Sequence, residues 1–147
     1  MKAKYIILLF AFNSITACGQ QQKTDKKSEK TTVKSTQKNN KMDLNKITNP
    51  TVKSAIEAWQ NGDSKSFLSY FTSDAKLYDD GSPRNFQNFV KEACGHEKFT
   101  TIEKVGNDGK DIIGNFHTES WGDFKTYFNF TINEEGKFSR LDIGQAK

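Results

Sequence analysis

The sequence predicts an α+β domain in which three helices come first and an antiparallel sheet follows. Between residues 50 and 93, apolar residues recur with a period of about 3.6, the spacing of helices that are packed on one face. After Gly95 the period falls to about two, and four strand-like segments follow with short turns between them. This segregation of helices from strands indicates helices on one face of a sheet.

The first predicted helix has a start signal, an apolar stripe and a stop signal. It is expected to begin at Asn49-Pro50, because Asn is a good N-cap and Pro is tolerated at the first helical position. Apolar residues from Val52 to Trp59 recur three and four positions apart and form one stripe. Gly62 then ends the helix in the manner of a C′ glycine.

Two shorter helices are predicted after it. Asp63 or Ser64 can cap the second, which carries Phe67, Leu68 and Phe71. Residues 75–78 read as a short strand and residues 79–81 as a turn. Ser82-Pro83 repeats the cap-plus-proline start and predicts a third helix, with an apolar stripe formed by Phe86, Phe89, Val90 and Ala93.

The four later strands are expected at residues 99–105, 111–119, 124–132 and 137–143. The short turns that separate them are typical of antiparallel neighbours. In the third strand, alternate residues from Phe124 to Ile132 are mostly apolar, while those from Lys125 to Asn133 are mostly polar. One face of the sheet should therefore be packed. The chain has 12 phenylalanines, and those of the domain supply the core.

Charge is unevenly distributed along the 147 residues. The formal net charge is +4. Residues 18–46 hold eight lysines against three acidic residues, whereas residues 47–147 hold 12 basic and 15 acidic residues, a net charge of −3. The folded part thus has no basic excess, which argues against a nucleic-acid surface.

The N-terminus has the layout of a secretory signal. Lys2 and Lys4 precede an apolar stretch at residues 5–12, which is too short to span a bilayer. With Ile15-Thr16-Ala17-Cys18 after it, the segment resembles the bacterial lipoprotein signal. That resemblance implies removal of residues 1–17 and lipidation of Cys18. Gly19 stands where an aspartate would retain the protein at the inner membrane under the enteric sorting logic, which favours the outer membrane.

Residues 18–46 are predicted to be a disordered tether between the lipid and a domain at residues 47–147. The segment is rich in Lys, Gln and Thr and has only three sizeable apolar residues. It can bury too little apolar surface to offset its ordering entropy. Its lysines could also contact anionic lipid head groups, and both roles can hold together.

The domain also resembles a known family. Residues 55–63, 67–71 and 73–80 look like the first half of an NTF2-like, SnoaL-like domain, and residues 128–142 are similar to its last two strands. The resemblance implies a cone-shaped fold with an internal pocket. Members include isomerases, cyclases, dehydratases, association domains and plain binding proteins, so the fold does not decide the chemistry.

Ketosteroid isomerisation is the best-studied chemistry of this fold, and Asp79 matches its general base. The resemblance places Ala55 at the position of the oxyanion tyrosine and Lys125 near that of the second oxyanion donor. A base without an oxyanion hole loses a large catalytic term, so this activity is not expected. Asp79 remains a candidate acid/base. The simpler interpretation is that residues 79–82 only form a turn.

Other side chains are candidates for a ligand pocket. Arg84 follows the acids of the turn, where it can form an ion pair or clamp a ligand. Trp121 is unusual at a turn tip and can act as a lid or a contact surface. His117 is expected to point away from the core if Phe116 points into it. The complete set of candidates is Trp59, Tyr78, Arg84, His117, Trp121 and Tyr127.

These observations favour a lipid-anchored envelope protein that binds a small or apolar ligand. If Cys18 is acylated, Cys94 is left alone and no internal disulfide forms. The two histidines are too few and too unpatterned for a metal site, and no cofactor is expected. Two alternatives stay open: a pocket enzyme that uses Asp79, and a homodimeric interaction module that pairs through the open sheet face.

Overall fold

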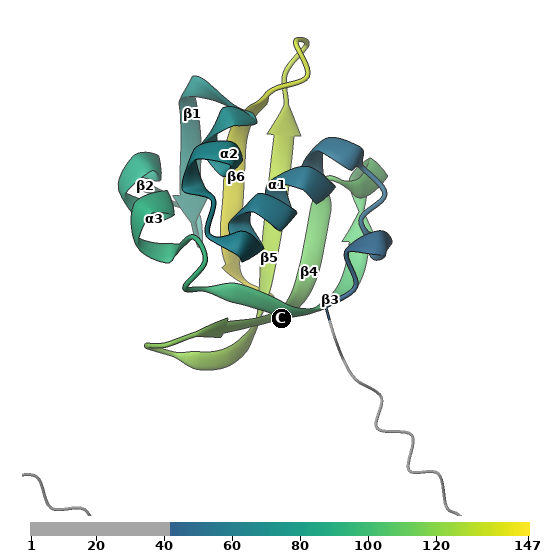
Figure 1. Cartoon of the computed structure of the whole chain (residues 1–147), viewed down its shortest axis with the longest axis vertical. Helices are drawn as coiled ribbons and strands as arrows, with labels where there is room; N and C mark the ends of the chain where they lie inside the picture. The colour runs from purple at the N-terminus through teal and green to yellow at the C-terminus, as the bar shows by residue number, and fades with distance from the viewer. Residues whose placement is uncertain (1–41) are drawn as a thin grey trace, which may run out of the picture. The chain divides into compact units, whose positions relative to one another are not determined.

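The computed structural model describes residues 42–147, which form a curved six-stranded sheet and three α-helices (Figure 1). Cys18, the predicted signal and most of the predicted tether lie outside the described residues. In chain order the elements are η1 Leu44–Lys46, α1 Pro50–Asn61, α2 Ser64–Ser69, β1 Phe71–Asp79, β2 Ser82–Arg84, α3 Phe86–Ala93, β3 Lys98–Gly106, η2 Asn107–Gly109, β4 Asp111–Thr118, β5 Gly122–Ile132 and β6 Phe138–Gln145.

The predicted α+β class is confirmed, but the sheet is mixed rather than wholly antiparallel. Its strand order is β2-β1-β6-β5-β4-β3. Every pair is antiparallel except β1 and β6, which run parallel, with Leu77 opposite Leu141. The sequence-based expectation missed this pair because β1 and β6 are separated by most of the domain, and no turn signal connects them.

The first helix is as predicted. The Asn49 side chain accepts hydrogen bonds from the backbone N–H groups of Thr51 and Val52, both at 3.1 Å. At the other end, Gly62 is in the left-handed conformation with φ of 73°, which glycine adopts without a steric penalty. The apolar stripe is buried, and Val52 and Trp59 are completely inaccessible to solvent.

The third helix begins later than the sequence suggested. Asn85 caps it by accepting a hydrogen bond from the Asn88 N–H at 2.9 Å, so α3 starts at Phe86. Ser82 and Pro83 instead belong to β2, the edge strand beside β1. Proline is tolerated there because an edge strand has one side without ladder hydrogen bonds.

The ordered domain also reaches back beyond residue 47. Asp43 caps the short helix η1 by accepting a hydrogen bond from Asn45 N–H at 3.0 Å. Lys46 Nζ donates to the backbone carbonyl of Ile102 on β3 at 2.6 Å, and Ile47 is buried. Residues 42–46, assigned to the tether from composition, therefore pack against the domain.

No helix among residues 42–147 is both long and apolar enough to cross a bilayer.

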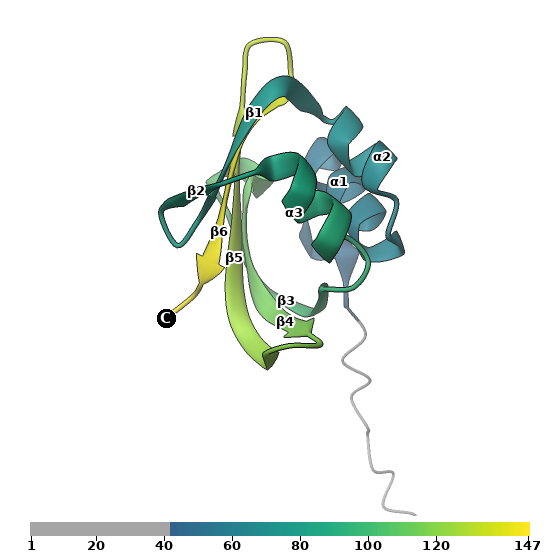
Figure 2. The same cartoon turned by 90° about the vertical axis from the view of Figure 1, so that its left-hand side faces the viewer.

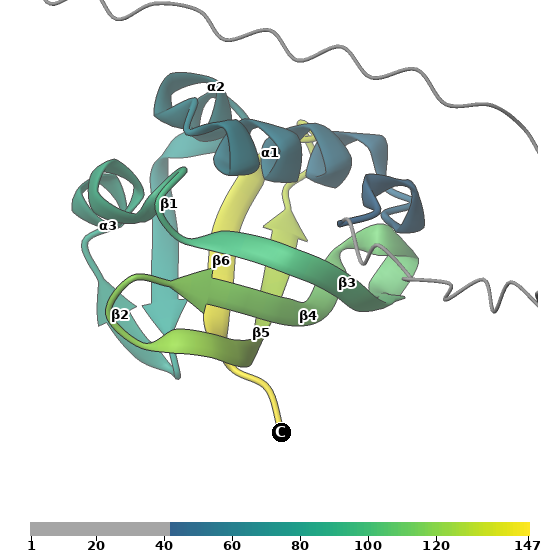
Figure 3. The ribbon, with the colours of Figure 1, turned by 60° about the horizontal axis from the view of Figure 1, so that its bottom comes forward.

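All three helices lie on the same side of the sheet, and the strands bend toward them at one end (Figure 2). Figure 3 shows β3 and β4 turned away from the direction of β1 and β6. The β3–β4 pair has two register shifts, at Phe99/Thr101 and Ile102/Lys104. Such irregularities increase the local twist of a sheet.

Aromatic rings fill the space between helices and sheet. The Trp59 ring lies 5.1 Å from that of Phe67, 5.5 Å from that of Phe89 and 5.7 Å from that of Phe128, between centroids. Phe128 and Phe130 on β5 are buried with Thr126, as the alternation of that strand predicted. The core therefore connects α1, α2 and α3 to the central strands, and it ends where a cavity begins.

Candidate functional site

A cavity of about 680 Å³ opens between the ends of β1 and β6, the β4–β5 hairpin and the start of α3. Its lining combines aromatic and charged side chains. The aromatic residues are Phe89, Phe116, Trp121, Phe124 and Phe128, and the charged residues are Asp79, Asp80, Arg84, Glu97 and Asp123. Thr118, Thr126, Ile143, Gly144 and Gln145 complete the lining.

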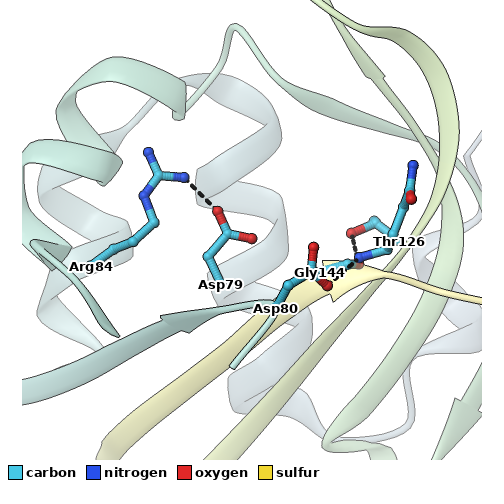
Figure 4. A network of polar contacts seen from close by, with 6 residues as sticks. Asp79, Asp80, Arg84, Thr126 and Gly144 are labelled. Atoms are coloured by element: carbon cyan, nitrogen blue, oxygen red, sulfur yellow. Dashed lines mark hydrogen bonds and ion pairs between the residues drawn. The ribbon is translucent and has the colours of Figure 1, made fainter. Parts of the chain in front are cut away.

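Two of the predicted residues meet at the mouth of this cavity. Arg84 on β2 donates to the carboxylate of Asp79, at the end of β1, over 2.6 Å (Figure 4). The Arg84 guanidinium also lies 4.9 Å from the centroid of the Phe89 ring. The side chains of Arg84 and Asp79 are 44% and 31% exposed. The pair therefore positions the β1–β2 turn and contributes little net stability.

Glu97 was missed by sequence reasoning, although it lines the same cavity, and its carboxyl group is near enough to Arg84 and Asp79 for their charges to shift its pKa. Burial raises the pKa of Glu97, Arg84 partly offsets this, and Asp79 adds to the rise. Among residues 42–147 its carboxyl group has neither an ion pair nor a hydrogen bond. A carboxyl group with a raised pKa in a cavity is suited to proton transfer or to binding a hydrogen-bond donor.

The backbone at Glu97 is held firmly. Its carbonyl accepts a hydrogen bond from Trp59 Nε1 at 2.7 Å, and its N–H donates to the carbonyl of Ala93 at 2.8 Å. Just before it, Gly95 is so close to Gly62 that a Cβ there would lie 2.5 Å from the Gly62 Cα. Only glycine permits this approach, which holds the link before Glu97 against the end of α1.

Part of the cavity lining is formed where β6 meets the turn after β1. Asp80 accepts a hydrogen bond from the Gln145 N–H at 3.0 Å, and Thr126 donates to the carbonyl of Gly144 at 2.8 Å. Figure 4 shows Asp80 against Gly144, with Thr126 on the neighbouring strand. A Cβ at Gly144 would lie 2.1 Å from Asp80 Oδ1, so this packing requires glycine.

Trp121 lines the outer edge of the cavity from the turn between β4 and β5. Trp121 exposes 82% of its surface to solvent, whereas the other large apolar side chains among the described residues are buried or partly buried. Its backbone N–H donates to the Thr118 hydroxyl oxygen at 2.9 Å, which ties the turn to the end of β4. Trp121 therefore lines a cavity, and its role as a lid or a contact surface stays a prediction.

The structure places the other predicted residues elsewhere. Trp59 belongs to the core rather than to the cavity lining. His117 is exposed on the opposite face of β4, where its Nδ1 lies 2.7 Å from Asp123 Oδ1. Tyr78 lies under the guanidinium of Arg140, which is 3.9 Å from its ring centroid.

Tyr127 lines a second hollow, of about 630 Å³, beside η2 and the C-terminus. Burial raises the pKa of its hydroxyl, and the carboxylates of Asp80, Asp142 and Asp79 raise it further. Asp79, Arg84 and Trp121 are thus the predicted residues that share the first cavity.

Comparison with known proteins identifies the fold. Neither the family models nor the sequences of curated proteins give a match to this chain. Among solved structures, an NTF2-like protein of unknown function from Cytophaga hutchinsonii has a TM-score of 0.55 and 11% identity, covering 72% of this chain and 92% of its own. A protein from Sphaerobacter thermophilus also has a TM-score of 0.55, with 13% identity and coverage of 66% and 94%. The chain therefore has the NTF2-like fold, as the sequence resemblance implied.

A third similar structure contains a ligand. It is the orange carotenoid protein of Anabaena (Nostoc) sp. PCC 7120 binding canthaxanthin, with a TM-score of 0.54 and 20% identity. The match covers 66% of this chain but only 35% of the carotenoid protein, so it concerns about a third of that molecule. At this identity the likeness concerns the fold alone.

Proposed function

We propose that this chain is a lipid-anchored protein of the cell envelope whose domain binds a small, largely apolar ligand. The observation that carries the proposal is the cavity, whose volume of about 680 Å³ is typical of small-molecule sites. Phenylalanines from α3, β4 and β5 line it, with polar groups gathered near Asp79. In this proposal the curved sheet and the helices close into a cone around the ligand.

Two further observations support a ligand. About a third of a carotenoid protein that binds canthaxanthin, an apolar molecule, has a similar fold. Trp121 exposes 82% of its surface at the edge of the cavity, although burying an indole is strongly favourable. A ligand in the cavity would cover part of this ring.

Native mass spectrometry tests the proposal directly. The full-length protein is purified from its own cell envelope in a non-ionic detergent and examined under gentle ionisation. We expect a reproducible extra mass that is lost on activation. Trp121→Ala, which removes one wall, should retain less of it, whereas Glu135→Ala, at an exposed turn away from the cavity, should retain the same amount. Repeated recovery of the bare chain would contradict ligand binding.

The lipid anchor is proposed from Cys18 and the residues before it, and Gly19 supports placement at the outer membrane. Mass spectrometry of the mature N-terminal peptide should find acyl chains on Cys18. Cys18→Ala should abolish both acylation and recovery with the outer membrane. A mature chain that begins elsewhere, without lipid, would contradict this part of the proposal and leave ligand binding unaffected.

The second candidate function is enzymatic. It is favoured by the Glu97 carboxyl group, whose raised pKa and position beside the Asp79–Arg84 pair suit an acid or base. Asp79, predicted from the sequence, would then act with Glu97. If a substrate is found, Glu97→Gln and Asp79→Asn should each lower kcat by about 10²–10⁴-fold while the fold stays intact. Unchanged turnover in both variants would contradict this function.

A further inference from the structure

We infer that the ligand of this cavity is an organic cation, with an apolar, ring-containing body and a protonated amine. The inference rests on the proposed function, since it names the ligand class for the same cavity. It follows from three properties of the lining: its balance of charge, a carboxyl group without a partner, and aromatic rings in the same cavity.

The charge of the lining is negative. The lining contains four acidic residues, Asp79, Asp80, Glu97 and Asp123, against one basic residue, Arg84. Arg84 and Asp79 form an ion pair at 2.6 Å and largely cancel each other. Asp123 is paired with His117 on the other face of the β4–β5 hairpin, so among residues 42–147 Asp80 and Glu97 are the lining acids that no basic side chain pairs with. A cleft with charge of one sign concentrates ligands of the opposite sign.

Among these acids, Glu97 is the one with a free carboxyl group. Asp80 accepts the Gln145 N–H at 3.0 Å, and Asp123 lies 2.7 Å from His117. Within residues 42–147 nothing donates a hydrogen bond to the Glu97 carboxyl group. A partly buried carboxyl group is costly without a partner, and an ammonium group on a ligand would supply both hydrogen bonds and opposite charge.

The aromatic rings complete the recognition of a cation. Phe116, Trp121, Phe124 and Phe128 line the same cavity, and their faces attract positive charge. The cavity already contains one such contact, because the Arg84 guanidinium lies 4.9 Å from the Phe89 ring centroid. An amine with an aromatic or aliphatic body can therefore place its charge at Glu97 and its body among the rings.

An anionic ligand fits the site less well. The obvious binding group for an anion is Arg84, whose guanidinium is occupied by Asp79 and Phe89. An incoming carboxylate would share this guanidinium with Asp79 and would lie among the other acids of the lining. Like charges so close together repel each other in a partly enclosed site.

Three probes that share a naphthalene ring and differ in charge distinguish a cationic from a neutral or an anionic ligand. They are 1-naphthylmethylamine, 1-naphthalenemethanol and 1-naphthoate, which are cationic, neutral and anionic near neutral pH. Each is titrated by calorimetry into the full-length protein in a non-ionic detergent. We expect the amine to bind at least about tenfold more tightly than the alcohol, which corresponds to one charge-assisted hydrogen bond. The naphthoate should bind most weakly.

Matched variants then locate the amine. Glu97→Gln should weaken amine binding about tenfold and leave alcohol binding nearly unchanged. Glu103→Gln removes the same charge from β3, but Glu103 is paired with Lys125 outside the cavity, so both affinities should stay the same. This control also corrects for partition of the probes into detergent micelles.

The outcomes separate this inference from the proposed function. If amine and alcohol bind equally well, or if naphthoate binds most tightly, the cavity still binds ligands and the cation inference is wrong. Loss of amine binding in Glu103→Gln but not in Glu97→Gln would also overturn it. If none of the three probes binds, and the protein from its own envelope carries no extra mass, both the ligand-binding function and the inference fail.

Discussion

Trp59 Nε1 donates a 2.7 Å hydrogen bond to the backbone carbonyl of Glu97, joining the centre of the aromatic core to the cavity's free carboxyl group. The indole ring is completely buried against Phe67, Phe89 and Phe128. Because that packing fixes the ring, the hydrogen bond fixes the backbone at Glu97. Trp59 is therefore a positioning residue for the site, although it does not line the cavity.

Trp59→Phe should destabilise the protein and disturb the cavity together. The variant leaves the Glu97 carbonyl without its donor and opens space in the core. We expect the free energy of unfolding to fall by about 2–4 kcal/mol, measured by urea denaturation followed by circular dichroism. Amine binding should weaken in conditions where the variant is still folded.

Phe138→Leu is the control for this variant. Phe138 is fully buried but lies outside the cavity lining, so its truncation should lower stability and leave ligand affinity unchanged. If Trp59→Phe affected affinity no more than Phe138→Leu does, the hydrogen bond to Glu97 would have no positioning role.

Most of the fold could be predicted from the sequence, because the strongest signals in the sequence are local. The cap at Asn49, the glycine at Gly62 and the alternation along β5 each depend on neighbouring residues, and all three are present in the structure. The start of α3 was misplaced because Ser82-Pro83 and Asn85 both resemble helix starts, and pairing with β1 decides between them. That pairing is a tertiary contact, which local patterns do not contain.

The site was less accessible to sequence reasoning. Asp79 and Arg84 were identified together because they lie five positions apart around a turn. Glu97 had no comparable signal, since an acidic residue in a short link is usually solvated. Its role depends on Gly95 packing against Gly62 and on the bond from Trp59, neither of which has a sequence pattern. Trp59 itself was read as core or pocket wall, and the structure places it in the core.

The Asp79–Arg84 ion pair should contribute little to stability, despite its short distance. Both side chains remain partly exposed, so water screens their attraction. A double-mutant cycle of Asp79→Asn and Arg84→Gln should give a coupling energy of about 0–1 kcal/mol. Thermal unfolding of the four proteins at low and high salt provides the measurement. A coupling well above this range would mean that the pair holds the fold together.

Glu97→Gln should stabilise the unliganded protein at neutral pH. Burial raises the pKa of the folded-state Glu97 carboxyl above its unfolded value. Neutral Glu97 therefore contributes its full share of the folding stability below the pKa of the unfolded state, about 4.3. This contribution is lost as the pH rises through the pKa of the folded state. Glutamine keeps a neutral side chain of similar shape at every pH.

Melting temperatures at a series of pH values check this prediction. The advantage of Glu97→Gln over wild type should be largest near pH 7 and should shrink as the pH approaches about 4.3. Glu103→Gln should behave in the opposite way, because the hydrogen bond from Lys125 lowers the pKa of Glu103 and the variant loses the negative charge of that ion pair. An advantage of Glu97→Gln that did not depend on pH would show that ionisation of Glu97 is not its cause.

Gly144→Ala should distort the cavity lining where β6 meets Asp80. A Cβ at this position would lie 2.1 Å from Asp80 Oδ1 and 2.7 Å from the Tyr127 hydroxyl oxygen, closer than van der Waals contact allows. Asp80 would have to move, which would break its hydrogen bond with the Gln145 N–H. We expect a loss of about 1–3 kcal/mol in the free energy of unfolding and weaker binding of all three naphthalene probes. Gly106→Ala is the matched control, since a Cβ there would meet no atom within 4 Å and its φ is −137°. If both variants behaved alike, the close approach of β6 to Asp80 would not be what shapes the cavity.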